Sequence, residues 1–263
     1  MKLYILLYII ICILLYIFLN SPHIEHYTEQ PVIRILHLVL YSSSIEYDKM
    51  YLLTRDYYKK FNNLITIYYT FSPKYNIITL IDDILYIPGN ETYLPGILDK
   101  TIKAFLYCDL HYQYDYIVRS NISTIINFNL LFNKLNKINI AYGGGLINQL
   151  KWLDIASGIN DNKYFGTKYA SGTAIVFSNT MMKQFLLKKD KINYNIIDDV
   201  SIGILIKEQF PDITPISLDN FLFVSEDIQD INLYINNTIF YRNRCTDRKK
   251  DIDHMKHIIN KLL

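Results

Sequence analysis

The stretch Tyr114–Asn127 most constrains how this chain of 263 residues can fold. An apolar run, Tyr116–Val118, stops at Arg119, a polar cluster follows over residues 120–124, and a new apolar pattern then begins. A buried strand that ends in polar groups has this pattern. In open α/β sheets, ligands bind beyond the carboxyl ends of the strands. The stretch therefore predicts a sheet strand with a ligand-facing loop at its end.

Short β-branched or aromatic runs alternate with helical patterns along the rest of the chain. Strands are expected over residues 32–40, 64–69, 77–87 (interrupted at Asp82-Asp83), 116–118, 138–142, 174–177, 213–217 and 221–224. Helices are expected over residues 43–60 (with a capping box of Ser43 and Glu46), 95–110, 124–135, 179–188 (capped by Ser178), 200–208 and in the tail from 247. This alternation predicts an α/β domain with a mostly parallel central sheet.

Composition narrows the class of function. The hydrophobic content of 51% is enough for one domain with a real core. Charged residues make up 20% and the formal net charge is only +2, so the chain has no electrostatic footprint for nucleic acid. Cys108 and Cys245 lie far apart in the sequence, and both a disulfide and two buried thiols remain open.

The amino-terminal segment Met1–Leu19 is apolar enough to span a bilayer. Lys2 precedes the apolar core, while Glu25 and Glu29 follow it, which favours a single-pass type II anchor with the rest of the chain on the lumenal side. A cleaved signal peptide is the alternative, but no small-residue cleavage site ends the run. We expect an anchor over 1–19, a short stem over 20–31 and a catalytic domain over 32–263. The compartment would be the ER or Golgi type, or a virus-associated membrane.

Several common motifs are missing from the sequence. It has no G-x-G-x-x-G, no P-loop and no G-x-S-x-G. His254 and His257 would share a helix face, but they sit in a charged tail, where a solvated face is favoured over a metal site.

Four ordered blocks carry the functional signal. They are Asp83–Leu85 with Glu91–Thr101, then Tyr116–Ser123, then Tyr169–Ala174, then Asp198–Gly203. Together they resemble the β-1,3-galactosyltransferase and Fringe-like glycosyltransferases of GT-A fold. The sequence of Arg119–Thr124 is similar to that of glycosyltransferase-like proteins of large DNA viruses.

The resemblance implies a GT-A-type Rossmann-like sandwich that transfers a sugar from a nucleotide-sugar donor, UDP-linked, to a hydroxyl of a glycan or glycoprotein, with inversion. It implies donor contacts at Ser42, Arg55, Lys100 and Gly172. Asp199 matches the acid that would deprotonate the acceptor hydroxyl. Each has an ordinary alternative: a surface charge for Arg55, a solvated helix residue for Lys100, a turn for Gly172 and a helix cap for Asp199.

The second block departs from the family. Where the family carries the D-x-D acids that bind the donor's metal ion, this chain has Asn121, Ile122 and Ser123. Hard divalent cations prefer anionic oxygens, so neutral Asn121 and Ser123 oxygens predict no tight Mn²⁺ or Mg²⁺ binding here. The cofactor is therefore open, and Asn121 and Ser123 become expected donor contacts without a metal.

Three interpretations of the missing acids are open. The enzyme works without metal, with Arg119, Lys100 or Arg55 stabilising the leaving diphosphate. A metal is held by other acids, Asp82 and Asp83 included. Or the domain is a non-catalytic protein that binds a glycan or a nucleotide sugar.

Overall fold

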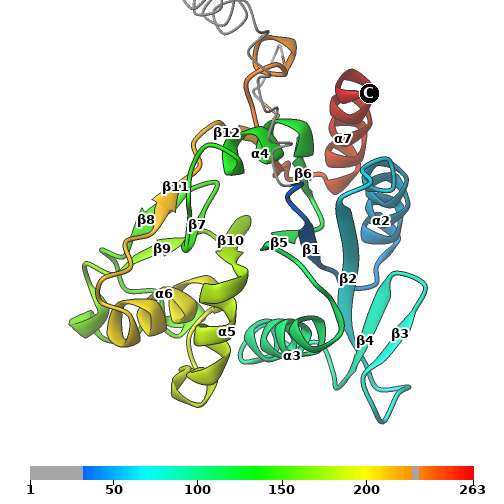
Figure 1. Cartoon of the computed structure of the whole chain (residues 1–263). Helices are drawn as coiled ribbons and strands as arrows, with labels where there is room; N and C mark the ends of the chain where they lie inside the picture. The colour runs from blue at the N-terminus through cyan, green and yellow to red at the C-terminus, as the bar shows by residue number, and fades with distance from the viewer. Residues whose placement is uncertain (1–31, 227–230) are drawn as a thin grey trace, which may run out of the picture. The chain divides into compact units, whose positions relative to one another are not determined.

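The central element is an eight-stranded sheet in the order β11-β7-β10-β5-β1-β2-β4-β3 (Figure 1), counted over residues 32–226 and 231–263, which the computed structural model describes. Its strands are β1 (Ile35–Leu40), β2 (Leu64–Ser72), β3 (Thr79–Ile81), β4 (Ile84–Pro88), β5 (Tyr116–Asn121), β7 (Tyr142–Gly144), β10 (Ala174–Ser178) and β11 (Ile216–Ser217). β5, β1, β2 and β4 run parallel, and β10 is antiparallel to β5. The prediction of an α/β fold with a mostly parallel central sheet is confirmed.

Helices cover both faces of this sheet (Figure 1). They are α2 (Ile45–Tyr58), α3 (Gly96–His111), α4 (Phe128–Leu135), α5 (Asn179–Leu187), α6 (Asp198–Gln209) and α7 (Arg248–Leu262). Because side chains alternate along a strand, Ile35 and Val39 of β1 face a core shared with α2, α4 and α7. Leu36 and Leu38 face the opposite core, shared with α3, α5 and α6. The result is a three-layer α/β/α arrangement.

Two smaller sheets flank the large one. β6 (Thr124–Ile126), β12 (Phe221–Val224) and β13 (Phe240–Asn243) form a three-stranded sheet in the order β12-β13-β6, and β8 (Ile147–Gln149) pairs with β9 (Lys168–Ala170). β6 follows directly on the loop after β5, and its antiparallel partner β13 places Arg242 opposite Thr124. A segment from near the end of the chain is thereby brought to the end of β5.

The expected helix over 124–135 is wrong in its first turn. Thr124–Ile126 is a strand, because this β-branched run pairs with β13. The helix begins only at Phe128, where the Asn127 side chain caps it by accepting a hydrogen bond from the Leu130 amide at 3.2 Å.

Two other expected starts are shifted. The N-cap of α2 is Ser44 rather than Ser43: its hydroxyl accepts from the Tyr47 amide at 3.2 Å, so the expected capping box does not form. The expected interrupted strand over 77–87 is the hairpin β3–β4, which turns at Asp82 with a positive φ of 53°.

The glycine run lies inside a strand rather than after it. Gly143 and Gly144 belong to β7, and a Cβ at either would collide with a backbone carbonyl, that of Ile216 or Ala174. The expected strand over 138–142 accordingly starts late, at Tyr142, because the glycines allow β10 and β11 to pack closely on both sides.

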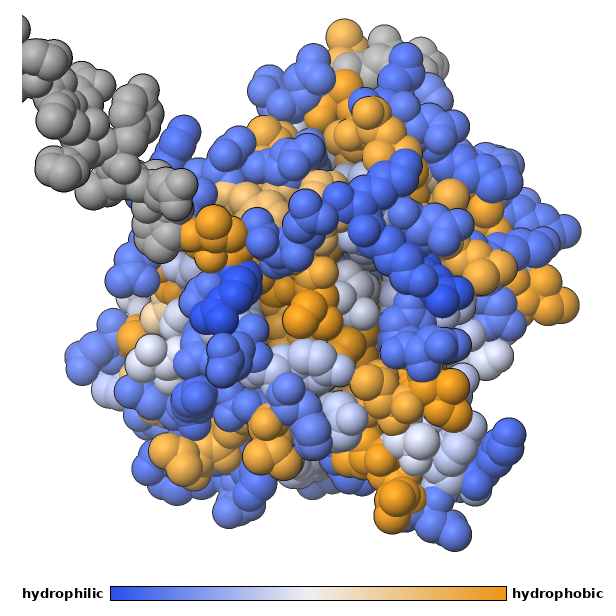
Figure 2. Space-filling model, turned by 45° about the vertical axis from the view of Figure 1, so that its right-hand side comes forward, coloured by the Kyte–Doolittle hydropathy of each residue, from blue (hydrophilic) through white to orange (hydrophobic). Residues whose placement is uncertain are grey.

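The predicted anchor and stem, residues 1–31, lie outside the described residues. Within the described ranges, no helix combines the length and the apolar character needed to cross a membrane. Figure 2 shows apolar side chains reaching the surface in patches between hydrophilic ones. Residues 33–263 form one compact unit.

Helix α6 packs directly on β9 through Gly203, the last residue of the fourth sequence block. A Cβ at this position would collide with the Tyr169 side chain. Gly203→Ala should therefore lower the free energy of unfolding by about 1 to 2 kcal/mol, despite the better helix propensity of alanine. Urea unfolding measures this. Glu208→Ala, at an exposed position of the same helix, is the control and should change stability by no more than about 0.5 kcal/mol. Equal stability of the two variants would refute the packing argument.

Candidate active site

The candidate site lies at the edge of the sheet where β1 and β5 end. These parallel strands finish side by side, with Leu40 opposite Asn121. The antiparallel strand β10 begins at the same edge, with Ala174 opposite Ser120, so the loop 171–173 that precedes it also lies there. This is the position at which ligands bind in open α/β sheets.

Two cavities adjoin at this edge. The larger has a volume of about 550 Å³ and the smaller about 210 Å³. Polar residues of the larger one include Ser42, Lys100, Asn121, Ser123, Arg242 and Arg248. Those of the smaller one include Arg119, Asn121, Asp198 and Asp199, and Gly172 lines it as well. Asn121 lines both, so the cavities form one continuous site, and seven of the eight predicted site residues line it.

Arg119, in the middle of this site, is 1% exposed. Its Nη2 lies 2.5 Å from Asp198 Oδ2, its Nε donates to the Tyr69 hydroxyl at 3.1 Å, and its Nη1 donates to the Gly172 carbonyl and to Asn121 Oδ1. Burial alone would lower the pKa of the guanidinium, but Asp198 and Tyr69 raise it above its ordinary value. One charged group thereby joins β5, β2, the loop before β10 and the start of α6.

Asp199 presents a carboxylate to the smaller cavity. Its Oδ2 accepts the Gly172 amide and its Oδ1 the Val200 amide, both at 2.8 Å. Burial, together with the charge of Asp198, raises the pKa of Asp199 to about 6, against the opposing effect of the Gly172 hydrogen bond and of Arg119. Each oxygen keeps a free lone pair. The carboxylate is therefore ionised but still basic near neutral pH.

The helix-cap alternative for Asp199 holds in part, because Asp199 is not the N-cap residue but lies in the first turn of α6, where its Oδ1 accepts the Val200 amide. α6 begins at Asp198, and its N-cap residue is Ile197, which makes no side-chain cap. Gly172 has a role beyond a turn, since a Cβ there would lie 3.0 Å from Arg119 Nη1 and 3.4 Å from Asp199 Oδ2. Its lack of a side chain allows the loop to pass between these two groups.

Lys100 is fully buried rather than solvated. Its ammonium group lies 2.7 and 2.6 Å from the two carboxylate oxygens of Glu91, 3.1 Å from the Tyr41 carbonyl and 3.2 Å from Ser42 Oγ. Burial lowers the pKa of Lys100, and Glu91 opposes that change. Because an ammonium group has three protons, these four acceptors use all of them. Lys100 therefore ties α3 to the end of β1 and orients Ser42 at the cavity.

The two residues at the expected metal position face cations. Asn121 Oδ1 accepts from Arg119 Nη1 at 3.2 Å, and the buried Ser123 Oγ accepts from Arg242 Nη1. A metal ion at these oxygens would lie against two guanidinium groups. The residues present do not fit a divalent cation.

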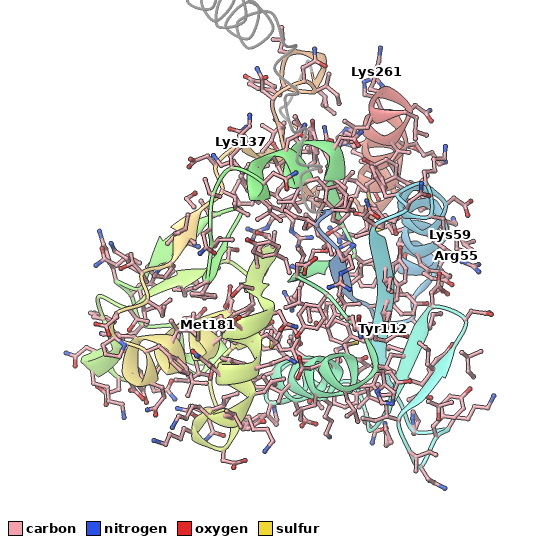
Figure 3. All side chains as sticks on the ribbon, in the orientation of Figure 1. Arg55, Lys59, Tyr112, Lys137, Met181 and Lys261 are labelled. Atoms are coloured by element: carbon pink, nitrogen blue, oxygen red, sulfur yellow. The ribbon has the colours of Figure 1, made fainter. Side chains whose placement is uncertain are left out.

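Arg55 is the one predicted donor contact that the structure does not bring to the cavities. It lies on α2 close to Lys59 (Figure 3), and its Nε is 3.0 Å from Asp83 Oδ2. Asp83 also accepts from the Tyr51 hydroxyl at 2.6 Å. Neither Asp82 nor Asp83 lines either cavity. Among the described residues, no three His, Cys, Asp or Glu side chains are grouped closely enough to hold a metal ion.

Sequence reasoning missed Arg242 and Arg248, which both line the larger cavity. Arg248 contacts the buried Asp251, and its guanidinium carbon lies 5.4 Å from the centre of the Tyr47 ring. The signal in the sequence is the basic cluster over residues 242–250, part of which belongs to the charged tail from residue 247. The pairing of β13 with β6 places Arg242 at the site, and the packing of α7 against α2 places Arg248 there.

Comparison with known proteins assigns no family. No protein-family model matches the sequence, and no curated protein matches it. Among solved structures, one similar chain is a glycosyltransferase involved in the glycosylation of the major capsid of PBCV-1, with 13% identity and a TM-score of 0.46 over 85% of this chain and 99% of that one. Another is the inositol-1-phosphate CTP transferase from T. maritima, with 9% identity and a TM-score of 0.45 over 89% of this chain and 97% of that one. Similarities of this size assign neither a fold family nor a function.

The raised pKa of Asp199 makes a prediction about stability. The folded state holds the Asp199 proton up to about pH 6, whereas the unfolded chain loses it near the ordinary aspartate pKa of 3.8. The folded state thus binds more protons between these values, and the contribution of Asp199 to stability falls as pH rises through them. Asp199→Asn removes this loss, so the free energy of unfolding of this variant relative to the native sequence should rise by about 2 kcal/mol between pH 4 and pH 7.

Urea unfolding of both proteins at several pH values measures this difference. Asp212→Asn, at an exposed position, is the matched control, and its stability difference should stay nearly constant. A pH-independent difference for Asp199→Asn would show that the Asp199 carboxyl group is not perturbed.

Proposed function

We propose that this domain is a glycosyltransferase of GT-A type that moves a sugar from a UDP-linked donor to a hydroxyl of a glycan or glycoprotein, with inversion. The observation that carries the proposal is the meeting of two unlike cavities at one sheet edge. The larger is lined by Arg242, Arg248 and the Lys100–Glu91 pair, and the smaller holds a carboxylate with a raised pKa. A nucleotide sugar needs the first for its diphosphate, and the acceptor hydroxyl needs the second for its proton.

The chemistry follows from Asp199. The acceptor hydroxyl gives its proton to the Asp199 carboxylate while its oxygen bonds to the anomeric carbon of the donor sugar. The bond from that carbon to the diphosphate oxygen breaks, and the nucleoside diphosphate leaves. One direct displacement of this kind inverts the anomeric configuration.

The four sequence blocks support the same proposal, because each contributes a residue to the site. The first contributes Lys100 with Glu91, the second Asn121, the third Gly172 and the fourth Asp199. Segments far apart in the sequence thus meet at one site, which supports the proposal. The type II anchor over 1–19, the lumenal location and the relation to proteins of large DNA viruses are further parts of this proposal.

A second candidate function is a non-catalytic protein that binds a nucleotide sugar or a glycan. The neutral Asn121 and Ser123 favour it, since they stand where the family carries acids. The two functions differ in turnover. Incubation with a panel of UDP- and GDP-sugars and glycan acceptors separates them: sugar transfer supports the enzyme, and donor binding without transfer or hydrolysis supports the binding protein.

The transferase proposal predicts a dependence of the rate on pH and on Asp199. Because the base must be ionised, kcat/KM should rise with pH through about 6 and then level off. Asp199→Asn should reduce kcat about 10²- to 10⁴-fold, since the amide cannot take the proton. Asp212→Asn should retain full activity. Unchanged kcat in Asp199→Asn would remove Asp199 from the role of base.

A further inference from the structure

We propose that Arg242, together with Arg248, forms a metal-free binding site for the donor's diphosphate, so that two guanidinium groups take the place of the metal ion at the end of β5. This inference rests on the proposed function in that it takes the ligand to be a nucleotide sugar. The binding site itself is argued from the contacts and charges of the described residues.

The first argument is that Arg242 is a cation without a counter-ion. Its Nη1 donates to Ser123 Oγ, and its side chain lines the larger cavity. No carboxylate of residues 32–226 or 231–263 lies within ion-pair distance of it. Arg242 is partly buried, and a charge in such a position without a partner is costly; the cost falls when an anion binds.

The second argument is the charge balance of the larger cavity. Lys100 is neutralised by Glu91, and Arg248 by the buried Asp251. Arg242 remains as surplus positive charge. Arg248 keeps 28% of its side chain exposed, so its guanidinium can contact an anion without leaving Asp251. Two adjacent guanidinium forks match the paired phosphoryl groups of a diphosphate.

The electrostatic effect of Arg248 on Arg242 agrees with this arrangement. Burial, and then the like charge of Arg248, lower the pKa of Arg242 to about 10, although Asp251 opposes them. Two cations that disfavour each other's charge are stabilised together by one anion bound between them.

The third argument concerns the metal ion that the family would place here. The Asn121 and Ser123 oxygens already accept hydrogen bonds from Arg119 and Arg242. The guanidinium groups of Arg119 and Arg242, which lie beside these neutral oxygens, repel a metal ion and attract a phosphate. Asn121 and Ser123 stand where the family carries acids, and Arg242 lies beside them. Both features make the site more positive than the family's metal site without its ion.

Titration calorimetry on the full chain in EDTA tests this site, with UDP, inorganic pyrophosphate and uridine as probes. Arg242→Gln should weaken UDP and pyrophosphate binding about 10- to 100-fold, the effect of losing a hydrogen bond between charged groups. Uridine affinity should not change. Arg244→Gln, an exposed arginine on the same segment, makes the same charge change away from the cavity and should bind UDP like the native sequence.

A second variant separates loss of the guanidinium group from loss of folding. Arg242→Lys keeps the charge but not the guanidinium fork, and should bind UDP more weakly than the native protein and more tightly than Arg242→Gln. Thermal unfolding of each variant checks that it is folded. In a separate titration without EDTA, added MnCl₂ should leave the UDP affinity of the native protein unchanged.

Several results would overturn the proposal: equal UDP affinity in Arg242→Gln and the native chain, at least a tenfold gain from Mn²⁺, or no binding of UDP and pyrophosphate at all. Failure of the proposed function gives a different pattern. If pyrophosphate binds through Arg242 but no donor sugar is transferred, the anion site stands and the transferase does not. If sugar is transferred equally well by Arg242→Gln, the transferase stands and the anion site does not.

Discussion

The buried ion pair between Arg119 and Asp198 is the interaction on which the site depends. A guanidinium inside a sheet is tolerated only when a carboxylate and hydrogen-bond acceptors compensate it. Asp198 supplies the carboxylate from the first turn of α6, and Tyr69, Asn121 and the Gly172 carbonyl accept the remaining hydrogen bonds. The pair therefore sets where α6 begins relative to β5. It also helps to place Asp199, which is next in the chain; burial raises the pKa of Asp199, the charge of Asp198 adds to that rise, and Arg119 opposes it.

The two cavities differ in charge because different kinds of segment supply them. The smaller is bounded by the loop before β10 and the start of α6, which bring two aspartates against one arginine. The larger receives Arg242 from β13, which pairs with β6, and Arg248 from α7, which packs in the core shared with β1 and α2. Adjoining cavities of unlike charge suit a reaction in which an anion leaves from one side and a proton is removed on the other.

A good part of this arrangement could be predicted from the sequence. Local patterns identified most of the strands and helices, because apolar periodicity reflects burial directly. The sequence blocks group Asp199, Lys100, Asn121 and Gly172, and these residues meet at one edge of the sheet. The misplaced boundaries have local causes: Thr124–Ile126 is compatible with helix or strand, and only its pairing with β13 decides between them.

By itself, the sequence determined the α/β alternation and the polar loop after β5, because both depend on the pattern of residues that are close together in the chain. It also determined that the expected metal position carries no acid. Only the tertiary structure decided what stands there instead. Arg242 lies 119 residues from Ser123, and Arg119 lies 79 from Asp198. Contacts between residues so distant depend on strand pairing and helix packing, which no local pattern encodes, and so the charge of the site emerges only when the chain is folded.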